Sequence, residues 1–204
     1  MASQRNTILR AAAEEVAAVG LRRTTLTDVA RRAGVSRMTV YREYGDAAAL
    51  FRALLTESIG QVVFGAEVDV RGLPTARERI VESAALSVER LSEHPMMRRV
   101  LELDPELLLP FVTDRFGSGQ RLALEHVRGQ LRAGMDEGSI RPLDVGPAAR
   151  LILLTAQSVI FSTRIVESEG SPAPSSTEAA ETDSSAHLGE HLRWMLDAYL
   201  RSPA

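Results

Sequence analysis

The 204-residue chain contains no cysteine, and all 24 of its basic residues are arginines. Without cysteine it can form neither a disulfide framework nor a thiolate metal site. This composition suits the reducing cytoplasm, where we expect the protein to act. The absence of lysine means that any contact with phosphate is made by a planar, potentially bidentate guanidinium group.

The sequence also has few long apolar segments. The most apolar one, residues 144–166, has a charge-free window of only thirteen residues, 151–163, whereas a membrane-spanning helix needs about 20. The N-terminus carries Glu14 and Glu15 and lacks the apolar core of a signal peptide. We therefore expect no membrane association, and we expect residues 144–166 to form a core or interface helix.

The charge is unevenly distributed along the chain. The net charge is −3, yet residues 1–52 carry nine arginines and five acids, whereas the remainder carries fifteen arginines and twenty-two acids. The overall balance argues against a protein that binds nucleic acid indiscriminately. A basic N-terminal part on an acidic body instead suits a small electrostatic footprint on DNA.

The most informative pattern is a pair of short helices, predicted over residues 24–32 and 36–44, around a tight turn. Gly34 stands where the turn requires a positive φ, which glycine adopts at little cost. Ser36 is a good N-cap for the second helix, and Val40 faces back toward the first. This is the helix-turn-helix pattern, in which the second helix enters the major groove of DNA.

The rest of the chain also shows helical spacing, and no segment alternates as a strand does. We therefore predict an all-α fold. A capping box at Thr75 and Glu78 starts one helix. The polar segment 171–185 is expected to be a mobile loop. The further predicted helices cover residues 8–19, 46–63, 75–91, 96–103, 124–135, 144–166 and 185–200, with another starting at Pro105.

Several short motifs around this turn resemble the N-terminal domain of TetR-type transcriptional regulators. They are residues 26–30 (LTDVA), 33–36 (AGVS), 39–41 (TVY), 44–46 (YGD) and 50–51 (LF). The resemblance implies a three-helix helix-turn-helix DNA-binding domain over residues 1–46 and a helical ligand-binding and dimerisation domain over residues 47–204. One position departs from the pattern, because Ala47 stands where family members commonly carry a lysine near a phosphate.

The resemblance implies a sequence-specific repressor that a small apolar or amphipathic ligand releases from a near-palindromic operator. It also implies a homodimer formed by the helices at 144–166 and 185–200. Tyr41 matches the phosphate-contacting tyrosine of the family. For base edges or the groove we predict Arg37, Met38, Thr39 and Tyr44, and for backbone positioning Thr25, Thr27, Ser36 and Arg42. Thr27 and Ser36 are equally well explained as helix caps.

Ligand-binding candidates in the second domain combine apolar residues with a few polar ones, as small-molecule sites do. They are Met97, Leu101, Leu108, Phe111, Phe116, Leu122, His126, Gln157 and Phe161. Each of these residues taken alone is better explained as core. His126 and Gln157 are the most informative, because a buried polar side chain without a partner costs about 1–3 kcal/mol.

Two other motifs have simpler explanations. Residues 187–191 (HLGEH) match a zinc-peptidase string, but only thirteen residues follow for a third ligand. Residues 117–119 (GSG) resemble the start of a dinucleotide-binding loop, but no strand precedes them. We therefore predict no metal, no cofactor and no enzymatic activity. Two alternatives remain open, a helical module that binds protein partners without DNA, and an enzyme with its site in the C-terminal domain.

Overall fold

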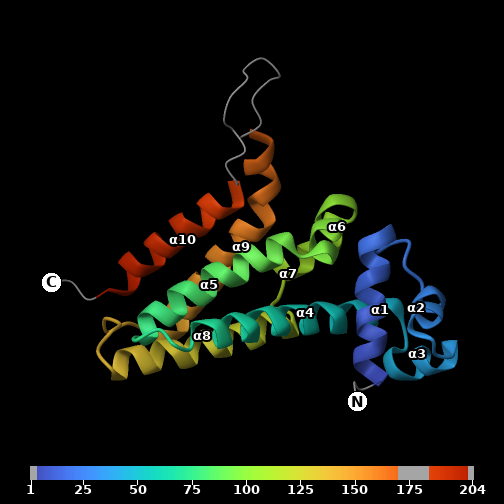
Figure 1. Ribbon diagram of the computed structural model, residues 1–204, viewed down its shortest axis with the longest axis horizontal. Coiled ribbons are helices and arrows are strands. Elements are labelled where there is room, and N and C mark those ends of the chain that lie inside the picture. Colours follow the sequence, from blue (N-terminus) through green and yellow to red (C-terminus); the bar gives the residue numbers. More distant parts are fainter. Residues whose placement is uncertain (1–3, 170–183, 202–204) are drawn as a thin grey trace. The chain divides into compact units, whose positions relative to one another are not determined.

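The computed structural model describes residues 4–169 and 184–201, and every regular element within them is helical (Figure 1), which confirms the all-α prediction. The predicted mobile loop at 171–185 falls almost entirely outside the described residues. The helices are α1 (Gln4–Val19), α2 (Leu26–Ala33), α3 (Arg37–Tyr44), α4 (Ala47–Val70), α5 (Ala76–Glu93), α6 (Pro95–Leu103), the 3-10 turn η1 (Pro105–Leu107), α7 (Leu109–Thr113), α8 (Ser118–Asp136), α9 (Val145–Glu169) and α10 (Ser184–Leu200).

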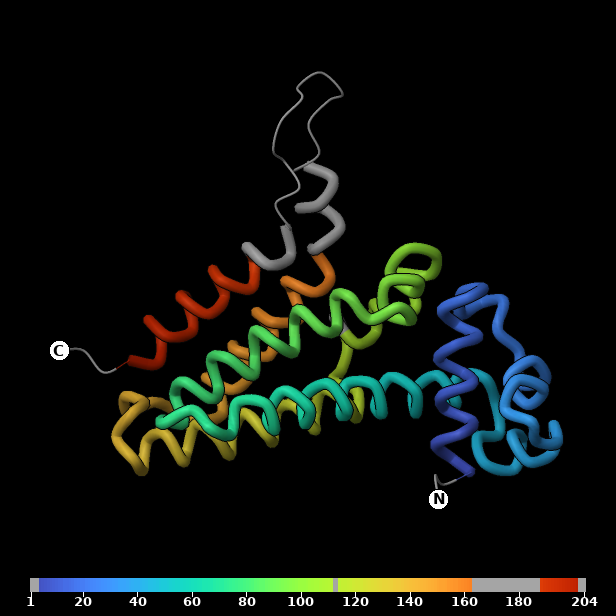
Figure 2. The backbone as a smooth tube through the Cα atoms, viewed as in Figure 1, coloured from blue at the N-terminus to red at the C-terminus, as the bar shows by residue number. Residues whose placement is uncertain are grey.

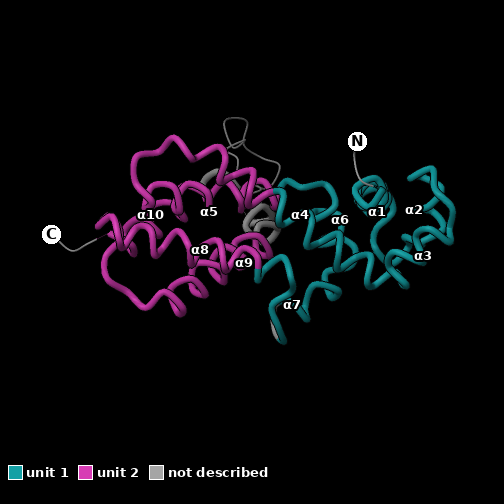
Figure 3. The backbone as a smooth tube through the Cα atoms, turned by 90° about the horizontal axis from the view of Figure 1, so that it is seen from below, with its two compact units in different colours: residues 1–61, 93–121 teal, residues 62–92, 122–204 magenta. Residues whose placement is uncertain are grey.

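The chain divides into two compact units (Figure 3). Unit 1 comprises residues 1–61 and 93–121, and unit 2 comprises residues 62–92 and 122–204. The first part of α4, together with α6 and α7, therefore belongs to the same unit as the three N-terminal helices. The predicted boundary after residue 46 separates the helices expected to bind DNA from the rest of the chain. The compact units instead group the residues that contact one another.

Unit 1 is built around α1, which packs against both α2 and α6 (Figure 2). The apolar face of α1 contributes Ile8 and Val16, both of which are almost fully buried. Val29 of α2 and Val40 of α3 are completely buried in the same unit. Because these apolar side chains leave water together, the first helix braces the two-helix motif as its spacing predicts.

The segment after α6 differs from the prediction. Pro105 starts a 3-10 turn, and Asp104 makes no capping hydrogen bond to it. Asp104 is instead buried and accepts hydrogen bonds from the backbone amides of Leu21 (2.8 Å) and Arg22 (3.3 Å) in the loop after α1. The carboxylate therefore satisfies two amides of the N-terminal domain, a role that its local sequence does not indicate.

Unit 2 has its own apolar core, contributed by α5, α8, α9 and α10. Arg193 of α10 donates to Glu82 (2.7 Å) and Glu89 (2.8 Å) of α5. The hydrogen bonds with Glu82 and then with Glu89 raise the pKa of Arg193 above its usual range. Through these two carboxylates α10 is bonded to α5.

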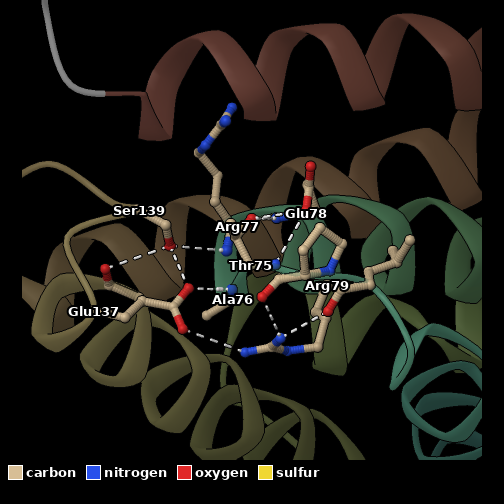
Figure 4. Close-up of polar contacts among 10 residues, drawn as sticks. Thr75, Ala76, Arg77, Glu78, Arg79, Glu137 and Ser139 are labelled. Carbon is tan, nitrogen blue, oxygen red and sulfur yellow. Dashed lines mark hydrogen bonds and ion pairs between the residues drawn. The ribbon is translucent and has the colours of Figure 1, made fainter.

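The predicted capping box at the start of α5 is confirmed (Figure 4). The Thr75 amide donates to Glu78 (3.0 Å), and the Glu78 amide donates to the Thr75 hydroxyl (3.2 Å). Glu137, just after α8, adds a second tie by accepting from the amide of Ala76. Hydrogen bonds from the Ser139 hydroxyl and from that amide lower the pKa of Glu137. The loop after α8 is thereby fixed to the start of α5.

Two of the described helical stretches, Ala47–Val70 and Val145–Ser162, are long and apolar enough to cross a membrane by length and composition alone. The second stretch begins before the charge-free window at 151–163 and includes one charged residue, Arg150. Core and interface helices of proteins outside membranes meet the same criterion, since a helix that is apolar all round is suited to burial in either environment.

Candidate nucleic-acid interface

The corner between α2 and α3 has the predicted backbone geometry. Gly34 adopts the left-handed conformation (φ 66°, ψ 30°). The Ser36 hydroxyl caps α3 by accepting from the amide of Thr39 at 3.1 Å. In α2 the cap is Thr25, which accepts from the Asp28 amide at 3.2 Å. Both helices therefore start from a side-chain cap, which fixes the direction in which α3 leaves the turn.

Burial on one side of α3 leaves its other side to solvent. Val40 is fully buried, whereas Met38 is 74% exposed and Tyr41 is 38% exposed. Arg37 and Arg42 are exposed as well. Met38 and Tyr41 lie beside two exposed arginines there, and these residue types are enriched at contact surfaces, so the outer face of α3 has the features of one.

Arg37 and Tyr41 form a pair on this face. The Arg37 guanidinium donates to the Tyr41 hydroxyl at 3.2 Å, and its central carbon lies 5.1 Å from the centre of the tyrosine ring. The two residues are four apart, so a helix places them on the same face. The hydroxyl accepts this bond, so its own hydrogen remains available. The pair thus offers a guanidinium and a hydroxyl donor at one place.

Other predicted contact residues are engaged within the protein. The Thr25 hydroxyl donates to Asp28 (2.5 Å), and the Ser36 and Thr39 hydroxyls are hydrogen-bonded to each other (2.8 Å). The Tyr44 hydroxyl is buried, and burial raises the pKa of Tyr44. Tyr44 therefore directs its hydroxyl into unit 1, and we leave it out of the interface that we propose below. Thr27 is exposed at the start of α2.

Several arginines of the N-terminal part have structural partners, which the sequence does not indicate. Arg32 donates to Glu15, a buried carboxylate of α1, at 2.7 Å. Arg22 lies 3.3 Å from Asp104. Arg22 and Arg32 therefore help to hold α1, α2 and α6 together. The arginines of α3 itself, Arg37 and Arg42, are both exposed.

The nine ligand-binding candidates are divided between the two units. Met97 and Leu108 are buried core residues of unit 1, and Gln157 is buried in unit 2. Unit 1 holds Met97, Leu101, Leu108, Phe111 and Phe116, and unit 2 holds Leu122, His126, Gln157 and Phe161.

His126 lines a cavity of about 190 Å³ within unit 2. Its Nδ1 faces the carboxylate of Glu67 at 3.5 Å, and its ring meets the edge of Phe64. Its Nε2 is buried and has no hydrogen-bond partner within the described part of the protein. Ser83 and Gln130 also line this cavity. In the neutral tautomer with its proton on Nδ1, Nε2 has a lone pair that can accept a hydrogen bond.

No group of three or more His, Cys, Asp or Glu side chains suited to a metal occurs in the parts of the chain that the structure describes. Of the two histidines in the zinc-peptidase string, His191 is exposed on α10, and the side chain of His187 lies outside the described residues.

Comparison with known proteins agrees with this geometry. Residues 8–54 match the family described as bacterial regulatory proteins, tetR family. A helix-turn-helix transcriptional regulator of Mycobacterium tuberculosis is 37% identical over 161 residues, which cover 79% of this chain and 82% of the relative. A regulator of Mycobacterium bovis matches with the same identity and coverage.

Solved structures show the same fold. The fatty acid degradation regulator FadR of Bacillus halodurans aligns with a TM-score of 0.69 and 18% identity over 96% of this chain and 95% of its own. FadR of Bacillus subtilis, solved with stearoyl-CoA, aligns with a TM-score of 0.66 and 22% identity over 96% of this chain and 98% of its own. With its capped α2–α3 corner and its close mycobacterial relatives, this chain belongs to the TetR family of bacterial transcriptional regulators.

Proposed function

We propose that this regulator is a cytoplasmic homodimeric repressor, which binds a near-palindromic operator through α3 of each copy and leaves it when a small amphipathic ligand binds. The observation that carries the proposal is the outer face of α3. Arg37, Met38, Tyr41 and Arg42 are exposed there, while the buried Val40 anchors the helix from behind. We assign the protein no catalytic role and no cofactor.

The side chains of α3 divide into two roles. The sequence alone predicts a base-edge or groove contact for Arg37, and its bond to Tyr41 leads us to a different assignment. The Arg37–Tyr41 pair acts on the DNA backbone, because a guanidinium and a hydroxyl donor held together suit one phosphate group. Met38, at the start of the helix, enters the major groove. There its exposed thioether side chain packs against a thymine methyl group, the one apolar feature of the base edges.

The dimer forms through α9 and α10, which contact each other within the chain. Both helices expose large apolar side chains. Leu151 and Leu154 of α9 are 52% and 45% exposed, and Trp194 and Met195 of α10 are 74% and 41% exposed. Burying this surface against a second copy explains the apolar composition of α9 without a membrane, and it brings two recognition helices to one operator.

The effector binds in the cavity beside His126. Its wall combines the apolar Val70 with the polar side chains of Ser83, His126 and Gln130, which favours an amphipathic ligand that can form hydrogen bonds. Glu67 and Val70, at the end of α4, line the same cavity. The bound stearoyl-CoA of the Bacillus subtilis neighbour supports an amphipathic effector of this kind.

Helix α4 provides the coupling between effector and DNA. It is one continuous helix from Ala47, three residues after α3, to Val70 at the cavity. A ligand that favours one arrangement of its far end shifts the population of states. A coupling of about 1–3 kcal/mol would weaken operator binding about 5- to 150-fold.

The DNA-binding proposal is tested by selecting genomic fragments with the purified full-length protein and measuring affinity by fluorescence anisotropy. We expect the wild type to select discrete sites and to bind them with strong salt dependence, because phosphate contacts release counterions. Arg37→Glu should abolish selection. Arg132→Glu, an equal charge reversal on the exposed side of α8 in unit 2, should leave it intact. Equal effects of the two reversals would argue against α3 as the interface.

The dimer is tested by sedimentation analysis. Trp194→Asp places a charge in the proposed interface and should produce monomers, because an unpaired buried charge is strongly unfavourable. Leu109→Asp is the matched control, since Leu109 is a 53% exposed residue of unit 1. A Trp194→Asp protein that sediments as the wild type would disprove this interface.

A further inference from the structure

The exposed side of α3 has a centre and two flanks, which can be assigned from the position of the buried Val40. An α-helix turns by about 100° per residue, so Met38 and Arg42, which stand two residues before and after Val40, both lie about 160° away from it. Arg37 and Tyr41 lie about 60° and 100° from Val40, on one flank of the exposed side. The burial agrees with this assignment, because Met38 is 74% exposed and Tyr41 is 38% exposed.

The position of a side chain on this helix decides which part of the DNA it can reach. The major groove is about 12 Å wide and admits one α-helix, with base edges at its floor and phosphate groups along its sides. Side chains at the centre of the exposed side therefore meet base edges, whereas those on a flank meet phosphates. Arg42, which the sequence alone assigns to the DNA backbone, shares the central position with Met38.

The guanidinium of Arg42 is available for a partner outside the chain. Arg42 is exposed, and within the described part of the protein no hydrogen bond, ion pair or ring contact engages its side chain. Arg37 differs, because it donates to the Tyr41 hydroxyl. Arg31 on α2 differs as well, because it donates to Asp28 at 2.6 Å. Arg42 therefore keeps all its donors for the DNA.

We propose that Arg42 reads a guanine in each operator half-site, within about two base pairs of the thymine that Met38 contacts. Guanine presents two acceptors, O6 and N7, on its major-groove edge, and a planar guanidinium matches them with two hydrogen bonds. The spacing follows from the helix, because residues four apart are separated by about 6 Å along its axis and stacked base pairs by about 3.4 Å. The inference rests on the DNA-binding role proposed above and adds to it the identity of a base.

The test measures how the full-length protein binds a selected operator and variants in which each base pair of one half-site is changed. Affinity is determined by fluorescence anisotropy. Replacing the contacted guanine should weaken wild-type binding about tenfold, as expected for the loss of a bidentate contact to one base. Arg42→Ala should bind the original and the changed operator equally well, and Met38→Ala in the same scan should locate the neighbouring thymine. Substituting 7-deazaguanine, which lacks the N7 acceptor, should weaken binding by the wild type but not by Arg42→Ala.

Arg132→Ala, on the exposed side of α8 in unit 2, is the matched control and should keep the wild-type base preference. The proposal is overturned if Arg42→Ala weakens binding to every operator variant equally, as the loss of a phosphate contact would. It is also overturned if Arg42→Ala changes neither affinity nor preference, if 7-deazaguanine affects both proteins alike, or if the base that Arg42 reads is not a guanine near the Met38 position. In each of these cases the wild type still selects operators, so the DNA-binding proposal stands. A wild type that selects no site would contradict both proposals.

Discussion

The Arg37–Tyr41 pair gives the sharpest prediction about how the protein holds DNA. If the two side chains bind one phosphate, Tyr41→Phe removes one hydrogen bond to a charged oxygen from each recognition helix. Such a bond contributes about 1.5 kcal/mol, so a dimer loses about 3 kcal/mol, or roughly 150-fold in affinity. The loss should be similar for every operator sequence, because phosphates carry no base identity.

A double-mutant cycle tests whether the pair acts as one unit. Arg37→Ala should lower the slope of log affinity against log salt by about 0.9 for each half-site. The double variant should cost less than the sum of the single variants, with a coupling of about 1 kcal/mol per half-site. The structural basis is the 3.2 Å bond between the two side chains.

Anisotropy titrations at several salt concentrations, on a selected operator and on variants with single base changes, provide the data. Arg132→Ala, on α8 in unit 2, controls for a general loss of positive charge. Additive single effects, together with an Arg37→Ala protein that loses base preference at one position per half-site, would show that Arg37 reads a base. The shared-phosphate argument would then be refuted.

Three further predictions concern individual side chains. Replacing thymine by uracil at the contacted position should weaken DNA binding by the wild type but not by the Met38→Ala variant, as measured by anisotropy. Equal losses for the two proteins would exclude the methyl contact. Asp104→Ala should lower the free energy of unfolding in urea by about 3 kcal/mol, because two loop amides lose a charged acceptor. Glu106 is an exposed partner of Arg22, so Glu106→Ala should cost under about 1 kcal/mol. Similar costs for the two variants would contradict this role of Asp104. The pKa of His94 is lowered in the folded state, so the free energy of unfolding should fall as the pH drops below about 6.5. His94→Gln should reduce that fall in urea titrations at several pH values. An unchanged pH profile would rule out His94 as the source of the pH dependence.

Local rules were sufficient to predict the helix-turn-helix corner. A positive φ at Gly34 and a cap at Ser36 depend on residues within one turn of each other, and so does the capping box at Thr75. The spacing of Arg37 and Tyr41 also signals a helix-face pair, although only the structure shows that the two side chains are bonded.

Long-range partners could not be predicted in this way. Asp104 reaches amides more than eighty residues away, and its sequence context before Pro105 favours a helix cap. The Gly-Ser-Gly string at 117–119 suggests a loop, yet α8 already begins at Ser118. A side chain at Gly119 would meet Ile59 at 2.9 Å, so close packing against α4 explains a glycine that the local sequence assigns to a loop.

The central claim is that two copies of α3 occupy successive major grooves of one operator. Hydroxyl-radical footprinting of a selected site with the full-length protein tests this most directly. The account predicts two protected segments related by a dyad, with centres about 34–36 Å apart or a multiple of that spacing. A single protected segment, or protection that survives Arg37→Glu, would contradict it.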